Sequence, residues 1–468
     1  MKSDRPARGI VPDAAMTPST DSIPAAARRG SPREVLALAA PVVITQLSTT
    51  AMGVVDSAMV GRLGATPLAA VGFSSIWIWT LFSLLYGTAS GVQTFVAQAD
   101  GAGRPEHCGG WTWHGFYTVA PVALLFTAVL IPAAEPLVAA LGPSTELQAA
   151  AVAYTTTRLM GEGAFAAAAV VTSFFRGVGD TRTPLYATLL ANAVNVVLDY
   201  GLIFGRLGLP EWGVAGAGAA TAVGSWVGAV TLYAAFRRHR LSQRFDTRPV
   251  FPDRTALARF FRTGAPIGGQ WCIGMTSFAC FTTVVARMGD ASMAASQAFV
   301  MLLSMSFMQA VGISIAAATL VGRYVGARDY AAVDRSYRSS LAIGLLLSGF
   351  IATLFIAVPG PLLAIFTDDP GVVSLGRPLL AVGALFQIFD FLAIVSQGAL
   401  RGAGDTRWPF AVETALGWGF FLPLAYLLGI VRGGGLTGAW IGGLIYVCAL
   451  ALLLMWRFRS GAWKRVAI

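Results

Sequence analysis

The sequence has little charge, few cysteines and few histidines. Asp, Glu, Lys and Arg together make up 12% of the 468 residues, about half of the ~25% found in soluble domains. The four cysteines and three histidines show no disulfide-like or metal-ligand spacing, so no metal site is expected. The sequence also lacks a P-loop and a nucleophile elbow, which argues against ATP-driven chemistry and against an enzyme. We therefore expect no cofactor.

Long apolar segments make up most of the chain. Residues of the AVILMFWYC set make up 56% of the chain, and a stretch of about 20 apolar residues suffices to cross a hydrocarbon core of ~30 Å. Twelve such segments lie near 35–59, 67–98, 111–132, 147–175, 184–204, 213–236, 257–285, 292–322, 337–358, 372–400, 408–430 and 437–457. The pattern predicts an all-α integral membrane protein with twelve transmembrane helices.

Positive charge is distributed as the positive-inside rule requires. If the N-terminus is cytoplasmic, most of the 33 Lys and Arg residues fall in cytoplasmic segments, above all in 237–262. This bias predicts a multi-pass protein of the plasma (inner) membrane with both termini in the cytoplasm. It also accounts for the net charge of +10 without nucleic acid as a partner. Residues 1–34, rich in Pro, Ala, Ser and Arg, are predicted to form a disordered cytoplasmic tail.

The two halves of the chain repeat one another. The segment Arg-Gly-Val-Gly-Asp-Thr-Arg-Thr-Pro at 176–184 recurs as Arg-Gly-Ala-Gly-Asp-Thr-Arg-Trp-Pro at 401–409, an offset of 225 residues. Since each half contains an even number of spans, the copies have the same orientation and are related by an axis along the membrane normal, as a parallel repeat. We expect two six-helix lobes, 35–236 and 263–468, joined by a cytoplasmic linker at 237–262.

Polar residues that occur in only one copy are better functional candidates than residues that both copies share. An ionised carboxylate inside a span costs ~2.5–3.5 kcal/mol on insertion scales, so such groups are rare without a function. The offset of 225 pairs Asp56, Asn195 and Asp199 with Phe281, Phe420 and Leu424. The first lobe therefore has a polar cluster where the second lobe is apolar.

Helix geometry places these first-lobe residues in the outer half of the lobe. With a rise of 1.5 Å per residue, Asp199 lies roughly 22 Å and Asp56 roughly 31 Å from the inner surface, and Thr221 lies about 12 Å from the outer end of its span. Asn195 is one turn from Asp199 on the same helix face. Two carboxylates in a low dielectric cannot both ionise at low cost, so we expect these four residues to attract H⁺ or Na⁺. An interhelical polar contact without a transport role is the alternative.

Three further positions carry separate expectations. Asp390 lies roughly 16 Å from the inner surface and its counterpart Phe165 is apolar, so Asp390 is a candidate second-lobe ligand for a cation, either ion or substrate. Pro41 kinks the first helix and acts either as a hinge or as a static bend. Glu413 is near enough to the inner end of its span to reach the interface, and we assign it no role.

Several short motifs follow one another in a fixed order. They are Val54 to Gly64 (VVDSAMVGRLG) with Leu68-Ala69-Ala70, Arg176 to Pro184, Asn195 to Asp199 (NVVLD), Gly213 to Gly216 (GVAG), and Ala220-Thr221. In combination they resemble the multidrug and toxic compound extrusion (MATE) transporters, over about residues 33–460. The resemblance implies a V-shaped cleft between the lobes, alternating access, and export of organic cations or other amphiphiles in exchange for H⁺ or Na⁺.

The resemblance also implies roles for single residues. Those similar to the first-lobe cation site of the DinF-like branch are Asp56, Asn195, Asp199 and Thr221. Pro41 is similar to the bending point of that branch's first helix, and Asp390 to the acidic residue in the tenth span of the NorM-like branch. The chain departs from the NorM-like pattern at Gly274, which stands about where that branch has an acidic residue in its seventh span.

We therefore expect a secondary active multidrug exporter, a monomer that exchanges amphiphilic or cationic small molecules for a cation, with H⁺ favoured over Na⁺. Its partners are these small molecules and membrane lipid. A flippase of the same superfamily for lipid-linked oligosaccharides or precursors is the alternative within transport. It predicts a basic cleft, whereas Arg158 is the one arginine expected clearly within a span. An integral membrane enzyme is the alternative of another class, and it would need a catalytic cluster at the interface, which the sequence lacks.

Overall fold

The structure is built from long helices. The computed structural model describes residues 29–140, 144–366 and 369–466, and these residues contain no β-strand. The first half comprises α2 (Pro32–Gly61), α3 (Ala65–Gly101), α4 (His107–Ala140), α5 (Thr145–Leu159), α6 (Glu162–Gly177), α7 (Arg182–Phe204) and α8 (Val214–Phe236), followed by the short α9 (His239–Phe245). The second half comprises α10 (Arg254–Ala286), α11 (Asp290–Gly326), α12 (Tyr330–Ala357), α13 (Pro359–Ala364), α14 (Pro370–Ala403), α15 (Arg407–Leu416), η1 (Gly417–Phe421), α16 (Leu422–Tyr426), η2 (Leu427–Val431), α17 (Gly435–Arg459) and η3 (Ala462–Arg465).

The prediction of an all-α membrane protein with two six-helix lobes is confirmed. In the described part of the chain, ten helical segments are long and apolar enough to cross a membrane, and α15 to η2 count as one of them. The other two predicted segments are occupied by α10 and by the pair α5–α6, which is interrupted at Met160 and Gly161.

Two predicted domain boundaries differ from the helix bounds. Helix α10 begins at Arg254, inside the predicted linker 237–262, because the Asp253 carboxylate accepts hydrogen bonds from the backbone N–H groups of Thr255 and Ala256 and caps the helix. Helix α2 begins inside the predicted tail 1–34, where the Ser31 side chain caps it. The rest of that tail, residues 1–28, lies outside the described residues.

The repeat is visible in the helix bounds themselves. Helices α3 and α11 both contain 37 residues and begin and end 225 positions apart. The copies diverge at two places. Helix α14 runs without a break where the first copy has the separate helices α5 and α6, and the eleventh span contains two π-helical turns, η1 and η2, where the first copy has the regular helix α7.

The π-helical turn η1 corrects the residue correspondence expected from a gapless offset. A π-turn accommodates one additional residue in a helix, so after η1 the offset grows from 225 to 226. The inward-facing, buried counterparts of Asn195 and Asp199 are therefore Phe421 and Ala425, rather than Phe420 and Leu424. The conclusion drawn from the comparison still holds, because both new counterparts are apolar.

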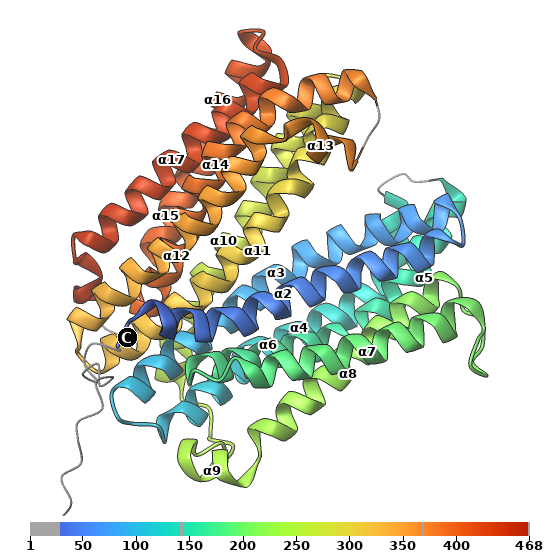
Figure 1. The fold of residues 1–468 in the computed structure, drawn as a ribbon. Coiled ribbons are helices and arrows are strands. Elements are labelled where there is room, and N and C mark those ends of the chain that lie inside the picture. The colour runs from blue at the N-terminus through green and yellow to red at the C-terminus, as the bar shows by residue number, and fades with distance from the viewer. Residues whose placement is uncertain (1–28, 141–143, 367–368, 467–468) are drawn as a thin grey trace, which may run out of the picture.

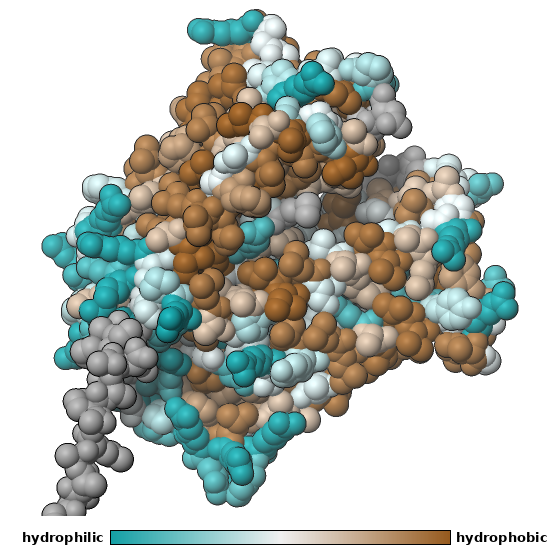
Figure 2. All heavy atoms as spheres, viewed as in Figure 1, coloured by the Kyte–Doolittle hydropathy of each residue, from teal (hydrophilic) through white to brown (hydrophobic). Residues whose placement is uncertain are grey.

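The two lobes form a V. They converge where α2 begins and α17 ends, and they diverge toward the opposite end (Figure 1). We call the point of convergence the closed end. In Figure 2 hydrophilic residues gather around the closed end and around α9, whereas the outer faces of both lobes are largely hydrophobic, as expected for surfaces that contact lipid.

The backbones of the two lobes approach very closely near the closed end. A Cβ atom at Gly87 of α3 would lie only 2.5 Å from the Cα of Gly268 on α10, and one at Gly91 would lie 3.0 Å from the Cα of Gly264. Real Cβ atoms essentially never come as near to a neighbouring backbone as 2.5 Å, so position 87 requires glycine, and a Cβ atom at position 91 would be tightly packed. The absence of side chains allows the second helix of one lobe to pack against the first helix of the other.

Cross-lobe hydrogen bonds complete this junction, which we call the interlobe seam. It comprises Gln93, Thr94, Gln98, Thr319 and Arg323. The hydroxyl of Thr94 donates to the Arg401 carbonyl oxygen, and the hydroxyl of its repeat counterpart Thr319 donates to the Arg176 carbonyl oxygen, both at 2.9 Å. The contacts follow the pseudo-two-fold symmetry of the lobes, so the seam is a product of the repeat.

We predict that Gly87→Ala lowers the stability of the folded protein. The added methyl group meets the Gly268 backbone and forces α3 and α10 apart, an overpacking effect of about 1–3 kcal/mol. The measurement is the thermal unfolding midpoint of the purified protein in detergent. Gly349→Ala in α12 is the matched control, because among the described residues nothing lies within 4 Å of a Cβ at that glycine. Equal midpoints for both variants would contradict the assigned role of the glycine contact.

Candidate functional site

A cavity of about 660 Å³ lies between the lobes. Helices α2, α3 and α6 of the first lobe and α10, α11, α14, α15 and α17 of the second contribute to its wall. The gap between the lobes is visible as an indentation of the surface on the side away from the closed end (Figure 2). Most of the lining residues are apolar or aromatic. The polar ones in the second lobe include Gln270, Asp390, Gln397, Arg401 and Glu413.

Aromatic rings from both lobes meet at the cavity wall. Tyr86 of α3 stacks on Phe165 with 5.7 Å between ring centroids, and it also contacts Trp79 at 6.0 Å. Across the lobe boundary, the ring of Trp271 on α10 lies 6.4 Å from that of Tyr86 in an edge-to-face arrangement. Aromatic faces attract organic cations and also bind flat apolar molecules. This part of the wall therefore suits an amphiphilic cation.

Two carboxylates of the second lobe line the cavity. Asp390 lies on α14 and Glu413 on α15, near enough for the two carboxylates to repel each other. The Gln397 amide donates to Glu413 Oε2 at 2.6 Å. Arg401 Nη2 donates to Gln397 Oε1 at 2.8 Å and to Gln270 Oε1 at 3.1 Å. A continuous chain of hydrogen bonds thus leads from Glu413 to Arg401.

The structure corrects our expectation that Glu413 reaches the membrane interface. Its carboxylate instead lies in the cavity wall, where Glu413 Oε1 faces Gly274 of helix α10. The sequence did contain a signal for this polar wall. Asp390, Gln397 and Arg401 follow one another at spacings of seven and four residues, which places all three on one face of one helix.

The expectation that Arg158 is the one arginine clearly within a span is wrong. Arg176 in α6 and Arg401 in α14 both line the cavity. The sequence pattern places both in cytoplasmic loops, but α6 continues to Gly177 and α14 to Ala403. The interlobe seam stabilises the last turn of each helix. The Thr94 hydroxyl donates a hydrogen bond to the Arg401 carbonyl oxygen, and the Thr319 hydroxyl donates one to the Arg176 carbonyl oxygen.

The four residues predicted as the first-lobe cation site lie on three adjacent helices. Asp199 on α7 is completely buried, and no described residue donates a hydrogen bond to either of its carboxylate oxygens. Asn195, one turn away, is 4% exposed, and its Nδ2 lies 3.5 Å from Thr221 Oγ1 on α8. The Thr221 hydroxyl donates to the Ala217 carbonyl oxygen. The polar groups of α7 and α8 are therefore in contact.

Asp56 on α2 is partly exposed and lies near enough to Asp199 for the two carboxylates to repel each other. Its Oδ1 atom is shielded from solvent and has no hydrogen-bond partner within the described chain. Arg158 attracts Asp56 and also forms an ion pair with Glu162. The described lining of the interlobe cavity includes none of the four predicted cation-site residues, so this polar cluster is separate from the cavity.

Aromatic rings fill the equivalent place in the second lobe. Phe281, the counterpart of Asp56, is 1% exposed and packs against Phe421 and Trp440, with ring centroids 5.1 and 4.9 Å away. The duplicated scaffold therefore holds a hydrophobic cluster in one lobe where it holds unpaired carboxylates in the other. A polar cluster retained in only one lobe is not required by the fold itself.

Helix α2 connects the polar cluster with the cavity. Pro41 lies in its interior, and its carbonyl oxygen accepts a hydrogen bond from the Thr45 hydroxyl at 2.8 Å. Beyond Pro41, Ser48 accepts a hydrogen bond from Asn192 of α7 at 2.8 Å. The same helix presents Gln46, Thr49 and Thr50 to the cavity. A movement of α2 relative to α7 would therefore change both the polar cluster and the cavity wall.

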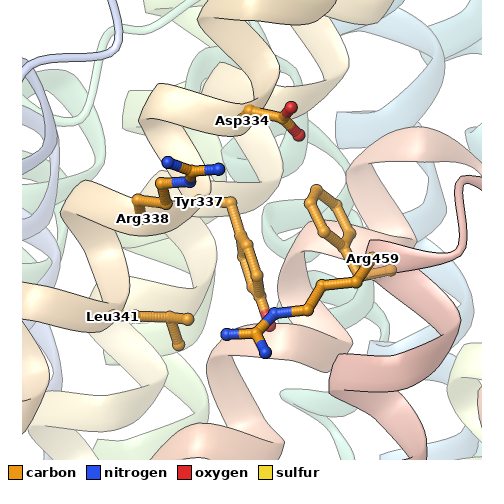
Figure 3. A pocket seen from close by; sticks show the side chains of 6 residues that line it. Asp334, Tyr337, Arg338, Leu341 and Arg459 are labelled. Carbon is orange, nitrogen blue, oxygen red and sulfur yellow. The ribbon is translucent and has the colours of Figure 1, made fainter.

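A second hollow lies near the closed end, between α12 and α17. Figure 3 shows Tyr337 at its centre, with Arg338 and Arg459 on either side and Asp334 nearby. The Tyr337 hydroxyl shares a hydrogen bond with Ser396 at 2.8 Å. Because the three charged side chains of this hollow are exposed, they belong to the hydrophilic surface of the closed end rather than to an enclosed site.

No metal-binding cluster is found among the residues that the structure describes. They contain no group of three or more His, Cys, Asp and Glu side chains that could hold a metal ion. The four cysteines, all within the described ranges, are free. Among the groups described above, the carboxylates of Asp56, Asp199, Asp390 and Glu413 lie in the interior of the helical lobes or on the cavity wall.

Two helical lobes that meet at one end and enclose an amphiphilic cavity, with buried carboxylates in the membrane region, define a membrane transporter. A protein-family model described as MatE matches the chain twice, at residues 41–201 and 266–427. The two matches begin 225 positions apart and so follow the internal repeat. The chain belongs to the MatE family of transporters and is not an enzyme.

Full-length relatives agree with this assignment. The chain is 30% identical over 442 residues to the probable multidrug resistance protein NorM of Thermotoga maritima, covering 93% of this chain and 94% of that protein. It is also 30% identical over 431 residues to the multidrug resistance protein MdtK of Proteus mirabilis, covering 90% and 94%.

Solved structures share the fold. A crystal structure of MATE in the bent conformation has a TM-score of 0.86 at 21% identity and covers 93% of this chain and 97% of its own. The eukaryotic MATE transporter AtDTX14 has a TM-score of 0.80 at 22% identity and covers 92% and 96%. These likenesses establish the two-lobe architecture.

We predict that Asp199→Asn raises the thermal unfolding midpoint at mildly alkaline pH. The substitution removes a charge that is fully buried without a hydrogen-bond donor, and an uncompensated buried charge costs several kcal/mol. A gain of at least about 1 kcal/mol is expected. Asp290→Asn, at an exposed position in the first turn of α11, should not raise the midpoint, because it removes a charge that favours the helix N-terminus by about 0.3–1 kcal/mol. A lower midpoint for Asp199→Asn would mean that the carboxylate has a stabilising partner.

Proposed function

We propose that this chain is a secondary active multidrug exporter, which exchanges cationic or amphiphilic small molecules for a cation by alternating access. The observation that carries the proposal is the position of α2 between two sites. It contributes Gln46, Thr49 and Thr50 to the aromatic cavity and Asp56 to the polar cluster with Asp199. The names of the NorM and MdtK relatives support multidrug substrates. Asp390, in the cavity wall, is proposed to bind the substrate's cationic group.

Asp56 and Asp199 carry the coupling cation in this proposal. While both are ionised, their repulsion opposes closer packing of the part of α2 around Asp56 against α7, beyond the contact of Ser48 with Asn192. A cation that enters from the outside neutralises one of them, and α2 then packs more closely against α7. That movement rearranges the part of the cavity wall that α2 supplies and weakens substrate binding. Ion and substrate thus favour different conformations, which coupled exchange requires.

H⁺ is favoured over Na⁺ because, besides the unpartnered carboxylate oxygens of Asp56 and Asp199, the cluster offers few oxygen ligands, since the Thr221 oxygen is engaged in hydrogen bonds. A hard metal cation needs several oxygen atoms around it, whereas a proton needs one carboxylate oxygen. The Asn195 amide nitrogen is directed at Thr221, and the Thr221 hydroxyl already donates to a backbone carbonyl. Na⁺ bound by Asp56, Asn195, Asp199 and Thr221 is the alternative.

Pro41 is proposed as the hinge of α2. Proline in a helix interior removes one backbone hydrogen bond and weakens the helix at that turn. The segment of α2 beyond Pro41 is also the one tied to α7 through Ser48 and Asn192. Bending at this point would move Asp56 and the cavity-lining residues of α2 together, while the N-terminal turns remain at the closed end.

We place the protein in the plasma (inner) membrane as a monomer, with both termini and the closed end on the cytoplasmic side. The arginine-rich segment 237–262 and the hydrophilic surface around α9 support this orientation (Figure 2). In this orientation the lobes diverge toward the outside, so the structure represents the outward-facing conformation. Protons would then reach the first lobe from the side on which the cavity opens.

A lipid-linked precursor flippase is the second candidate. The observation that favours it is the pair Arg176 and Arg401, two cavity-lining arginines that could bind a pyrophosphate. Against it, Arg401 is already hydrogen-bonded to Gln270 and Gln397, and two carboxylates line the same cavity. Acids would repel an anionic lipid precursor, so the exporter is the better proposal.

Efflux of ethidium under separately imposed pH and Na⁺ gradients tests the proposal. In cells or vesicles that contain the wild-type protein, efflux should follow the pH gradient. Asp199→Asn should reduce gradient-driven efflux by about tenfold, within the usual range of coupling between two ligands, because the variant can no longer exchange the proton. Asp290→Asn is the charge-matched control and should transport as the wild type does.

Each opposite outcome would contradict a defined part of the proposal. Wild-type rates for Asp199→Asn would remove Asp199 from the mechanism. Efflux that follows the Na⁺ gradient alone would reverse the choice of ion. Export that consumes ATP and needs neither gradient would overturn secondary transport.

A further inference from the structure

The hollow between α12 and α17 contains charged side chains that the proposed transport cycle does not use. It has a volume of about 420 Å³ and is lined by Asp334, Tyr337, Arg338, Leu341, Phe458 and Arg459. Helix α14 packs against both α12 and α17, and its Ser396 shares a hydrogen bond with the Tyr337 hydroxyl at 2.8 Å. The hollow is therefore a groove between two helices, with a third helix beneath it.

The floor of the hollow is apolar and well packed. Tyr337 is 3% exposed and Leu341 is 8% exposed. The rings of Tyr337 and Phe458 lie against each other and join the two helices, with 4.1 Å between their centroids. Because packing holds both rings in place, the floor offers a fixed apolar surface between the charged side chains.

The charges around this floor have no ionic partners in the protein. Among the described residues, no ion pair joins Asp334, Arg338 or Arg459 to another side chain. The Arg459 guanidinium lies near enough to the Tyr337 hydroxyl to interact with it electrostatically. Figure 3 shows Asp334 toward one end of the hollow and the Arg459 guanidinium toward the other, with Tyr337 and Arg338 between them. Two cations and one anion thus surround the hollow and can bind charged groups from outside.

The hollow lies where the lipid-facing surface meets the hydrophilic closed end. Arg338 of α12 and Arg459 of α17 each lie seven residues, or two helical turns, from an exposed leucine on the same helix face. These leucines are Leu345, which is 43% exposed, and Leu452, which is 60% exposed. Both lie roughly 10 Å from the arginines, on the side away from the closed end. The arginines therefore stand at the level of lipid headgroups, and the leucines at the level of acyl chains.

The acidic residue lies on the other side of the arginines. Helix α12 begins beside the end of α17, since the rings of Tyr330 and Trp463 are 6.0 Å apart. Asp334 precedes Arg338 by one turn on the same face, so it lies nearer to the closed end and farther from the exposed leucines. From the membrane outward, the groove therefore presents an apolar surface, then two cations, then one anion.

This order matches the order of chemical groups in a phospholipid with an amine headgroup. Its acyl chains are followed by a phosphate, whose oxygens suit the forked guanidinium group of arginine. Beyond the phosphate comes a primary ammonium group, which can donate hydrogen bonds to a carboxylate. Basic pockets between transmembrane helices are known to bind lipid headgroups. A carboxylate beyond the arginines would repel a second anionic group, so it favours a zwitterionic headgroup over an anionic one.

We propose that this hollow binds a phospholipid whose headgroup carries a phosphate and a primary ammonium group, the chemistry of phosphatidylethanolamine. Arg338 and Arg459 bind the phosphate, Asp334 binds the ammonium group, and the acyl chains lie over the apolar floor and the exposed leucines. The site belongs to the membrane leaflet at the closed end. It goes beyond the exporter function, and it depends neither on the transported substrate nor on the coupling ion.

Native mass spectrometry of the purified, delipidated full-length protein tests the site, because it resolves each bound lipid. Phosphatidylethanolamine, phosphatidylcholine and phosphatidylglycerol are titrated separately, all with the same acyl chains. The wild type should show one binding event that is strongest for phosphatidylethanolamine. Phosphatidylcholine has the same phosphate but a quaternary ammonium group that cannot donate hydrogen bonds, and phosphatidylglycerol has no cationic group.

Substitutions in the hollow separate the two parts of the headgroup. Arg459→Gln should weaken the binding event about fivefold, the usual contribution of one arginine near an anionic lipid. Asp334→Asn should abolish the preference for phosphatidylethanolamine over phosphatidylglycerol. Both side chains are exposed, so neither change should disturb folding. Arg240→Gln, at an exposed position in α9 outside the hollow, is the matched control and should bind all three lipids as the wild type does.

Opposite results would overturn the proposal. Equal binding of the three lipids by the wild type would do so, as would wild-type affinity in Arg459→Gln or an unchanged preference in Asp334→Asn. Glycerophosphoethanolamine, which has the same headgroup without acyl chains, should not displace the lipid at equal concentration. Displacement would assign the hollow to a soluble phosphate compound instead. Since no ion gradient or drug enters the measurement, its outcome is independent of whether the exporter proposal holds.

Discussion

The close contact of the two lobes at one end is the constraint on which the rest of the structure depends. Glycines at 87, 91, 264 and 268 bring the backbones of α3 and α10 together, and the interlobe seam adds hydrogen bonds that obey the symmetry of the repeat. From this junction the lobes diverge and enclose the cavity between them (Figure 1). Arg401 takes part in both features, because its backbone carbonyl accepts the hydrogen bond from Thr94 in the seam and its side chain lines the cavity.

A duplicated scaffold with different chemistry in its two copies explains how one fold could hold two ligands. In the first lobe, Asp56 Oδ1 and both carboxylate oxygens of Asp199 have no hydrogen-bond partner among the described residues. In the second, Phe281 and Trp440 fill the corresponding space, and the acidic residues lie instead on the cavity wall. Because the polar cluster of the first lobe is separate from the cavity, ion and substrate would not compete for the same atoms. Ion and substrate would instead compete through α2, which belongs to both sites. Binding of one would change how α2 packs and so weaken binding of the other.

The sequence predicts the fold well because its strongest signals are long and repeated. Twelve apolar segments and one offset of 225 suffice to locate the lobes and the helices. The polar cluster around Asp199 on α7 could be proposed because a carboxylate stands out in an apolar span. The surroundings of Glu413 could not be predicted. They depend on which residue of α10 lies opposite, and that contact is set by the packing of segments that are distant in the sequence. The π-helical turn η1 was likewise hidden, since one inserted residue leaves the hydropathy pattern unchanged while it rotates every later side chain.

The central claim is that a proton and an organic cation occupy separate sites yet exclude one another through one conformational change. Proton release on substrate binding tests it most directly. Tetraphenylphosphonium is added to the purified protein in weakly buffered solution, and the pH change is followed with an indicator dye across the acidic to neutral range. The account predicts that the wild type releases protons and that Asp199→Asn releases fewer. Binding without proton release by the wild type, or equal release by both proteins, would contradict it.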